Sequence, residues 1–285
     1  MDILSIIFYT LAITSLFLTT HKQIPIILTI SGIVFAGLAG YVSWVSLPFF
    51  VLIFMTSYGI YQSQHRLVQS LSILGFIIIG FITLLNKIPG MQYWNVISNI
   101  SLSTDAIPLN LYLAFDAPLL GIAIFLFSTP SPCNRTDIKR MIKMALWLIP
   151  TMLTIVIFSA IQLNYVRWDP KWTSLFFVWA LSNLWFTSMT EEAIFRRLFQ
   201  DTLRSLFQPI KFGTYIAIFT ASTLFGIAHI AGGINYVILA TIAGIFYGTA
   251  YHISGRIEAS ILCHFILNAT HFLLFTYPAL KTALL

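Results

Sequence analysis

Two adjacent glutamates and an arginine one helical turn later form the pattern in this sequence best suited to chemistry. Glu191 and Glu192 follow the apolar run 172–189, and Arg196 comes four residues after Glu192. Because residues four apart share a helix face, we expect Glu192 to pair with Arg196. Glu191 points about 100° away from Glu192 on a helix and is left as a candidate general base. A charge cluster at a helix end is the alternative interpretation.

Two histidines and an asparagine later in the chain supply further polar groups. The segment from Phe225 to His229 ends an apolar run, and His264 precedes Asn268 by four residues in another. His264 and Asn268 therefore share a helix face and can donate hydrogen bonds to one oxygen atom. A lone histidine in a membrane segment is more often a packing residue. Two histidines, an asparagine and a carboxylate pair spread over three nearby helices are harder to explain in that way.

Chain lengths favour a close approach of Glu191 and His229. Glu191 precedes Pro209 by 18 residues, and His229 follows Lys211 by 18 residues. Each arm of a helical hairpin would then be about 27 Å long, so a turn at residues 208–211 would place the two side chains level. This hypothesis requires residues 191–207 to remain helical although they carry several charged side chains.

The elements that carry these residues are predicted to be transmembrane helices. Of the 285 residues, 58% are hydrophobic and only 8% are charged, against roughly 25% charged in an average soluble domain. Since about 20 apolar residues cross a bilayer as a helix, we predict an all-α, polytopic transmembrane helical bundle of about eight to ten spans. The candidate runs are residues 3–20, 24–42, 44–61, 68–86, 109–128, 144–165, 172–189, 212–230, 235–254 and 259–277.

The chain is predicted to contain two parts. Residues 1–86 would form N-terminal accessory transmembrane helices, and residues 109–285 a core whose motif-bearing part is residues 172–277. Residues 87–108 are expected to form an interfacial loop and residues 129–140 a basic loop. Cys133 and Cys263 form no metal or disulfide pattern, and Cys263 is expected to be a small core residue.

The net charge of +6 is explained by basic residues in short loops. With ten spans, 11 of the 15 Lys and Arg residues fall on one side of the bilayer, which the positive-inside rule makes cytoplasmic. We therefore expect a multi-pass integral membrane protein, in the plasma membrane, with both termini outside. The lipid bilayer is an expected partner, and nucleic acid is not.

The set Glu-Glu-x-x-x-Arg, Phe-x-x-x-His and His-x-x-x-Asn, in that order on late predicted helices, resembles the CPBP family. This Abi-like family comprises type 2 CAAX prenyl proteases and bacteriocin-processing enzymes. The resemblance covers about residues 172–277. It implies an intramembrane glutamic endopeptidase that hydrolyses membrane-associated peptides or proteins, such as CAAX-type tails or peptide precursors.

The resemblance also implies a role for each candidate residue. Glu191 would be the general base that activates water, and His229 would help to hold that water. His264 and Asn268 would form the oxyanion hole. No cofactor and no metal are expected. The supporting residues would be Glu192, Arg196 and Phe225.

Three other interpretations remain open. A zinc-dependent membrane protease would use Glu191, His229 and His264 as ligands, since two histidines and a carboxylate form a catalytic zinc set. The sequence has no His-Glu-x-x-His motif, and zinc would leave Asn268 without a role. A non-proteolytic immunity or scaffold protein of the same fold is the second. The third is a transporter with intramembrane carboxylates as ion sites, although no inverted repeat is visible.

Other polar residues are given structural interpretations. Arg197 departs from the family pattern, where a small residue such as glycine commonly follows the motif arginine. His252 and His271 are expected to be structural, and Asn183 and Asn235 to make hydrogen bonds between packed helices.

Overall fold

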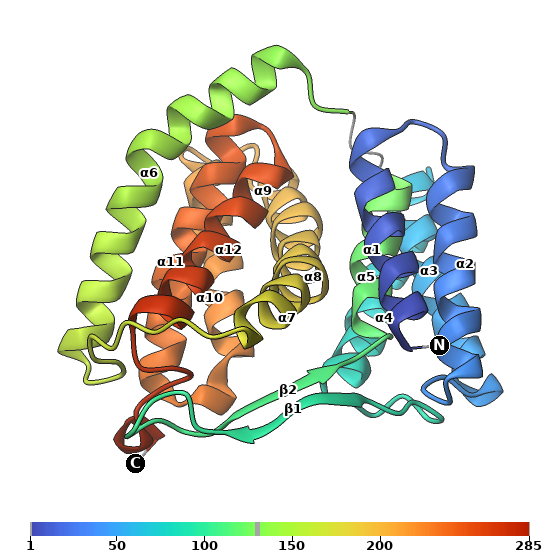
Figure 1. The fold of residues 1–285 in the computed structure, drawn as a ribbon. Coiled ribbons are helices and arrows are strands. Elements are labelled where there is room, and N and C mark those ends of the chain that lie inside the picture. Colours follow the sequence, from blue (N-terminus) through green and yellow to red (C-terminus); the bar gives the residue numbers. More distant parts are fainter. Residues whose placement is uncertain (1, 129–131, 285) are drawn as a thin grey trace. The chain divides into compact units, whose positions relative to one another are not determined.

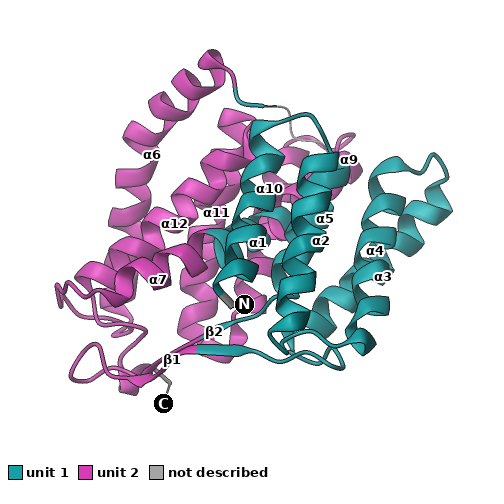
Figure 2. Cartoon of the chain, turned by 45° about the vertical axis from the view of Figure 1, so that its right-hand side comes forward, with its two compact units in different colours: residues 1–95, 112–133, 185–193 teal, residues 96–111, 134–184, 194–285 magenta. Residues whose placement is uncertain are grey.

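The computed structural model describes residues 2–128 and 132–284 and is largely helical (Figure 1). The chain divides into two compact units, each assembled from separate stretches of the sequence (Figure 2). Unit 1 contains residues 1–95, 112–133 and 185–193, and unit 2 contains residues 96–111, 134–184 and 194–285. A two-stranded sheet is formed by β1 (Trp94–Ile100) and β2 (Leu109–Leu113).

Unit 1 is built around the short helix α5 (Ala117–Ser128). This helix contacts four others, α1, α3, α4 and α8. Ten of its residues are buried, which is the pattern of a helix that is apolar on every side and lies inside a bundle. The other helices of this unit are α1 (Asp2–Leu18), α2 (Gln23–Leu38), α3 (Leu47–Gln62), which follows a 3-10 turn (Trp44–Ser46), α4 (Arg66–Leu84) and α8 (Met189–Glu192).

A buried carboxylate marks the start of α5. Asp116 is fully buried, and its Oδ1 accepts a hydrogen bond from the backbone N–H of Ala117 at 3.0 Å. The hydroxyl of Tyr93 donates to Oδ2 of Asp116 at 3.5 Å. Burial, together with this negative neighbour, raises the pKa of Tyr93 to about 12, so its hydroxyl remains protonated at neutral pH.

Unit 2 is built around the long helix α11 (Ile234–Ser254), which packs against α6, α10 and α12 (Figure 1). The helix α6 (Arg135–Gln162) begins with a capping box formed by Asn134 and Asp137. Unit 2 also contains α7 (Leu175–Leu181), α9 (Asp201–Leu206), α10 (Gly213–Ala228), α12 (Ile257–Leu274) and the 3-10 turns Ile230–Gly232 and Lys281–Leu284.

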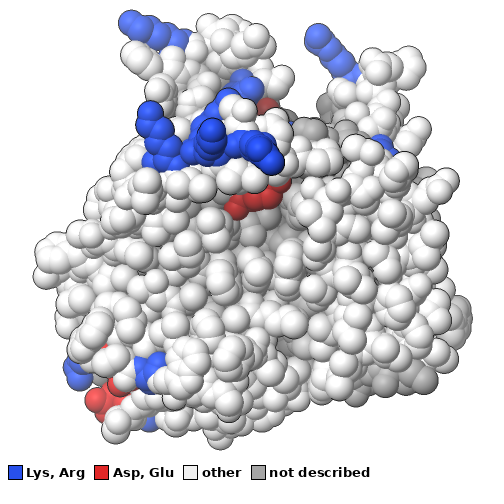
Figure 3. Space-filling view, turned by 45° about the horizontal axis from the view of Figure 1, so that its top comes forward, with Lys and Arg blue, Asp and Glu red and all other residues white. Residues whose placement is uncertain are grey.

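Five helices are long and apolar enough to cross a membrane, within the residues that the structure describes. They are Trp44–Gln62, Arg66–Leu84, Arg135–Gln162, Ile234–Ser254 and Ile257–Leu274, and four further apolar helices are shorter. Figure 3 shows a surface on which Lys and Arg gather in a cluster while most of the remaining area is uncharged, as expected for a protein that faces lipid. The helical class is confirmed, and the number of eight to ten spans stays a prediction.

The expected span at residues 109–128 is wrong as a single helix. Its first part is strand β2, in which Leu109 and Leu113 are buried, and the helix starts only at Ala117, with Pro118 in its first turn. Proline is favoured in the first turn of a helix and disfavoured inside one, so it divides the apolar run. The predicted basic loop 129–140 is shorter than expected, because α6 already begins at Arg135. Residues 129–131 of that predicted loop lie outside the described residues.

The requirement that residues 191–207 be helical is met almost to its end. Helical conformation continues from Leu175 to Leu206, with π-helical stretches at Ser182–Ser188 and Ala193–Gln200 on either side of α8. The turn predicted at residues 208–211 is also confirmed, since α9 ends at Leu206 and α10 begins at Gly213.

A glycine allows α5 and α8 to approach closely. A Cβ atom at Gly121 would lie 2.6 Å from the sulfur of Met189 and 3.2 Å from the Cα of Thr190. Any larger side chain must therefore displace the helix turn that carries Glu191.

We predict that Gly121→Ala destabilises the protein by about 1 to 3 kcal/mol, the usual cost of overpacking a filled core. Gly80→Ala is the matched control, because its Cβ would meet only Leu120 at 4.0 Å. The measurement is thermal unfolding of both variants in detergent. Equal melting temperatures for the two variants would show that the approach of α5 and α8 is not tight.

Candidate active site

Three of the predicted catalytic residues line one small pocket inside unit 2. His229, His264 and Asn268 surround a cavity of about 80 Å³, together with largely apolar side chains from α6, α10, α11 and α12. A cavity of this size holds at least one water molecule. The remaining walls are mainly hydrophobic and aromatic, so these three polar side chains line a largely apolar space.

His229 is held in one orientation by Phe225, the first residue of the Phe-x-x-x-His motif. It caps the C-terminal end of α10, and its Nδ1 lies 2.7 Å from the backbone carbonyl oxygen of Phe225. Since a carbonyl oxygen can only accept, Nδ1 carries the proton and Nε2 is left as an acceptor when the ring is neutral. The imidazole also packs on the ring of Phe225 at 4.5 Å and against Tyr236 at 5.2 Å.

His264 is held by the packing of α11 against α12. The hydroxyl of Ser260, one turn earlier, donates to the carbonyl oxygen of Tyr247 at 2.9 Å. The His264 ring then stacks on the Tyr247 ring, with 4.6 Å between centroids and an interplanar angle of 12°. The edge of Phe225 meets the same imidazole at 5.7 Å. Two aromatic rings therefore determine the orientation of His264.

Asn268 is oriented by a second asparagine. Its Nδ2 donates to Oδ1 of Asn183 at 3.3 Å. One helical turn from this contact, the rings of Trp179 and Phe272 stack with 4.5 Å between their centroids. Because Asn183 follows Trp179 by four residues and Asn268 precedes Phe272 by four, the same helix faces bring the two amides together. One proton of Nδ2 remains to be donated elsewhere.

Arg196 is a completely buried cation. Its Nη1 donates to the hydroxyl of Ser222 at 3.3 Å, and its guanidinium lies 5.5 Å from the centre of the Phe225 ring. Two glycines one turn apart on α11 make room for it. Cβ atoms at Gly244 and Gly248 would lie 3.3 and 3.4 Å from its terminal nitrogens.

Glu191 and Glu192 belong to α8 in unit 1. Glu192 is fully buried, and Glu191 is half-buried. The pairing of Glu192 with Arg196 and the approach of Glu191 to His229 stay predictions.

Several residues around the pocket have more definite positions than the sequence indicated. Tyr247 was not identified from the sequence, because an aromatic residue in an apolar helix carries no distinguishing signal. Asn183 was expected to make a hydrogen bond between helices, and its partner is now seen to be Asn268. His271 lines the pocket, and its Nε2 lies 3.1 Å from the carbonyl oxygen of Thr276. Cys263 is fully buried, as predicted.

A comparison with protein families matches the segment that contains His229, His264 and Asn268. Residues 172–270 match the model of the Rce1-like type II CAAX prenyl endopeptidases. This stretch is therefore similar to a CAAX-protease domain. The resemblance inferred from the three motifs is therefore confirmed over the segment that contains them. The comparisons with curated proteins and with solved structures gave no match.

The family match and the apolar helices together identify an integral membrane protein. The matched segment contains all the candidate residues from Glu191 to Asn268. It leaves out α1 to α4, whose predicted accessory role stays a prediction.

We predict that Asn183→Ala lowers turnover with little change in KM, because Asn268 loses the acceptor that orients its amide. Asn183→Asp keeps an acceptor oxygen at this position and should restore much of the turnover. Asn235→Ala is the control, since Asn235 also lies in a helix but does not line the pocket. The measurement is kcat and KM for each variant, alongside the melting temperature. A fall in melting temperature with unchanged kcat would reduce Asn183 to a packing residue.

Proposed function

We propose that the protein is an intramembrane endopeptidase that hydrolyses peptide bonds of membrane-associated substrates with water activated by Glu191. The observation that carries this proposal is the convergence of His229, His264 and Asn268 on one pocket, within a segment that matches a CAAX endopeptidase family. CAAX-type tails and membrane-bound peptide precursors are the proposed substrate classes.

The first step requires a base and a positioned water molecule. The carboxylate of Glu191 would take a proton from water while the Nε2 atom of His229 accepts the hydrogen bond of the same water. The contact between Nδ1 of His229 and the Phe225 carbonyl oxygen supports this role, because it leaves Nε2 as the acceptor. The hydroxide formed in this way adds to the carbonyl carbon of the scissile peptide bond.

The second step requires stabilisation of the negative charge on the tetrahedral oxygen. A ring N–H of His264 and the remaining Nδ2 proton of Asn268 would donate to this oxygen. Both side chains are held before substrate arrives, His264 by the Tyr247 ring and Asn268 by Asn183. Donors that need no reorganisation in a site of low polarity are the most effective. Collapse of the intermediate then breaks the C–N bond, and the proton held by Glu191 passes to the leaving amine.

We predict that Glu191→Gln abolishes proteolysis, a loss of at least about 100-fold, because an amide cannot accept a proton at neutral pH. The control is Glu192→Gln, which should lower yield or melting temperature and leave the folded fraction active. The measurement is cleavage of prenylated and unprenylated CAAX-type peptides by purified protein in detergent. Near-normal turnover by Glu191→Gln would refute the assignment of the base.

We predict that Asn268→Ala lowers turnover by about 100- to 1000-fold, the usual cost of removing one oxyanion donor. Substrate binding should change little, because the donor acts on charge that develops during the reaction. Turnover, apparent affinity and melting temperature are measured separately. A lower melting temperature with normal specific activity would assign Asn268 a structural role only.

A further inference from the structure

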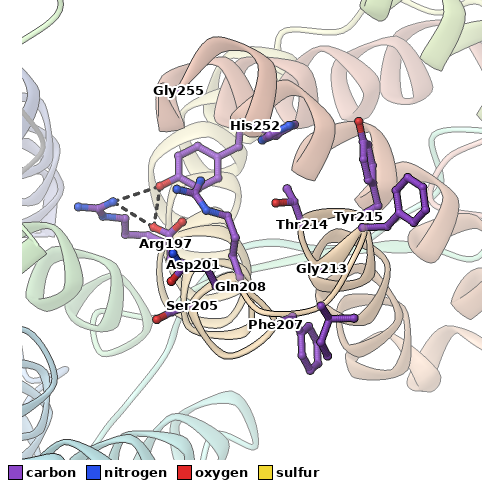
Figure 4. Close-up of a pocket in the computed structure, with 14 residues that line it drawn as sticks. Arg197, Asp201, Ser205, Phe207, Gln208, Gly213, Thr214, Tyr215, His252 and Gly255 are labelled. Carbon is purple, nitrogen blue, oxygen red and sulfur yellow. Dashed lines mark hydrogen bonds and ion pairs between the residues drawn. The ribbon is translucent and has the colours of Figure 1, made fainter.

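A second and much larger pocket lies in unit 2, apart from the catalytic residues. Its volume is about 930 Å³, and it is formed by α9, the connection to α10, the start of α10 and the end of α11 (Figure 4). None of the residues assigned to catalysis lines it. It does contain Arg197, the residue that departs from the family pattern, and His252.

One wall of this pocket is a fixed network of three side chains. Nη1 of Arg197 lies 3.0 Å from Oδ2 of Asp201 and donates to the hydroxyl of Tyr251 at 3.1 Å. The Tyr251 hydroxyl donates in turn to the same carboxylate oxygen at 2.7 Å. Asp201 is thereby neutralised by a neighbouring cation, which limits its repulsion of an anion.

The remaining charge of the pocket is positive. Arg204 lines the pocket one helical turn after Asp201 and is exposed. His252 lies nearby on α11, and its ring meets that of Tyr215 at 6.3 Å. Among the lining residues the charges are two arginines and one aspartate, so the wall has a net charge of +1 with histidine neutral.

The start of α10 adds to this preference for anions. This helix has 16 residues, and its first residues, Gly213 and Thr214, line the pocket. Its N-cap, Phe212, provides no side-chain hydrogen bond to the first turn. The N–H groups of Gly213 and Tyr215 already donate to the carbonyl oxygens of Ile210 and Phe212. The N-terminal end of the helix still attracts negative charge through its dipole. Ser205 and Gln208 supply further hydrogen-bonding groups.

Apolar side chains border the charged part of the pocket. Ile210 is 51% exposed, and Phe212 and Tyr215 are each 64% exposed. The ammonium group of Lys211 lies 5.2 Å from the centre of the Phe212 ring. A ligand that fits both regions carries a negative head and apolar chains.

We propose that this pocket binds the headgroup of an anionic phospholipid, with its phosphate near Arg204 and the start of α10 and its acyl chains along Ile210, Phe212 and Tyr215. Basic pockets between helices at the cytoplasmic surface bind such headgroups in other membrane proteins. The bound lipid would connect α9, α10 and α11, and this inference does not depend on the proposed peptidase activity.

The test is lipid binding to the full-length protein in neutral detergent, measured by native mass spectrometry. Phosphatidylglycerol is compared with phosphatidylcholine of the same acyl chains and with inorganic phosphate. Phosphatidylglycerol should bind more tightly than phosphatidylcholine, and Arg204→Gln should weaken its binding by about fivefold. Arg204→Lys should retain most of the affinity. Arg135→Gln, which removes an exposed arginine outside the pocket, should bind as the wild type does.

Equal effects of Arg204→Gln and Arg135→Gln would overturn the site, as would equal binding of the two lipids. Competition by inorganic phosphate as strong as that by phosphatidylglycerol would overturn the lipid assignment and leave a free-anion site. Melting temperatures of the variants without lipid confirm that each is folded.

Discussion

The packing of Phe225 is the interaction on which the pocket in unit 2 depends. Its ring lies beside the buried guanidinium of Arg196 and contacts the imidazoles of His229 and His264. Its carbonyl oxygen accepts the Nδ1 proton of His229. An aromatic ring attracts a cation most strongly where water is excluded. One residue therefore contacts both the buried charge and the two histidines.

Burying polar groups among apolar helices requires room as well as partners. Gly244 and Gly248 leave the space that Arg196 occupies, and Gly121 leaves the space in unit 1 that Met189 and Thr190 occupy. Small residues at such positions let helices approach closely without a hydrophobic force between them. π-helical stretches lie on both sides of α8. Such irregular turns inside helices are frequent at functional sites.

The sequence predicted the parts of this structure that follow from helical periodicity. The hairpin turn before Gly213, the end of α10 at His229 and the shared face of His264 and Asn268 all depend on spacing and apolar runs. It did not predict the division of residues 109–128 into a strand and a helix, because hydropathy alone does not distinguish a buried strand from a span. The π-helical turns were also not predicted. The contact between Asn183 and Asn268 joins distant segments, and local patterns do not encode which segments meet.

We propose that Glu191 and His229 act on one water molecule, and cysteine cross-linking tests this proposal directly. Glu191→Cys and His229→Cys are combined in a protein whose Cys133 and Cys263 are replaced by serine and alanine. The membrane protein is treated with a short bifunctional thiol reagent and then cleaved at Lys211, which lies between the two positions in sequence. We expect the fragments to stay joined for this pair and to separate for the control pair Glu192→Cys with His229→Cys. Efficient joining of the control pair together with separation of the first would contradict it.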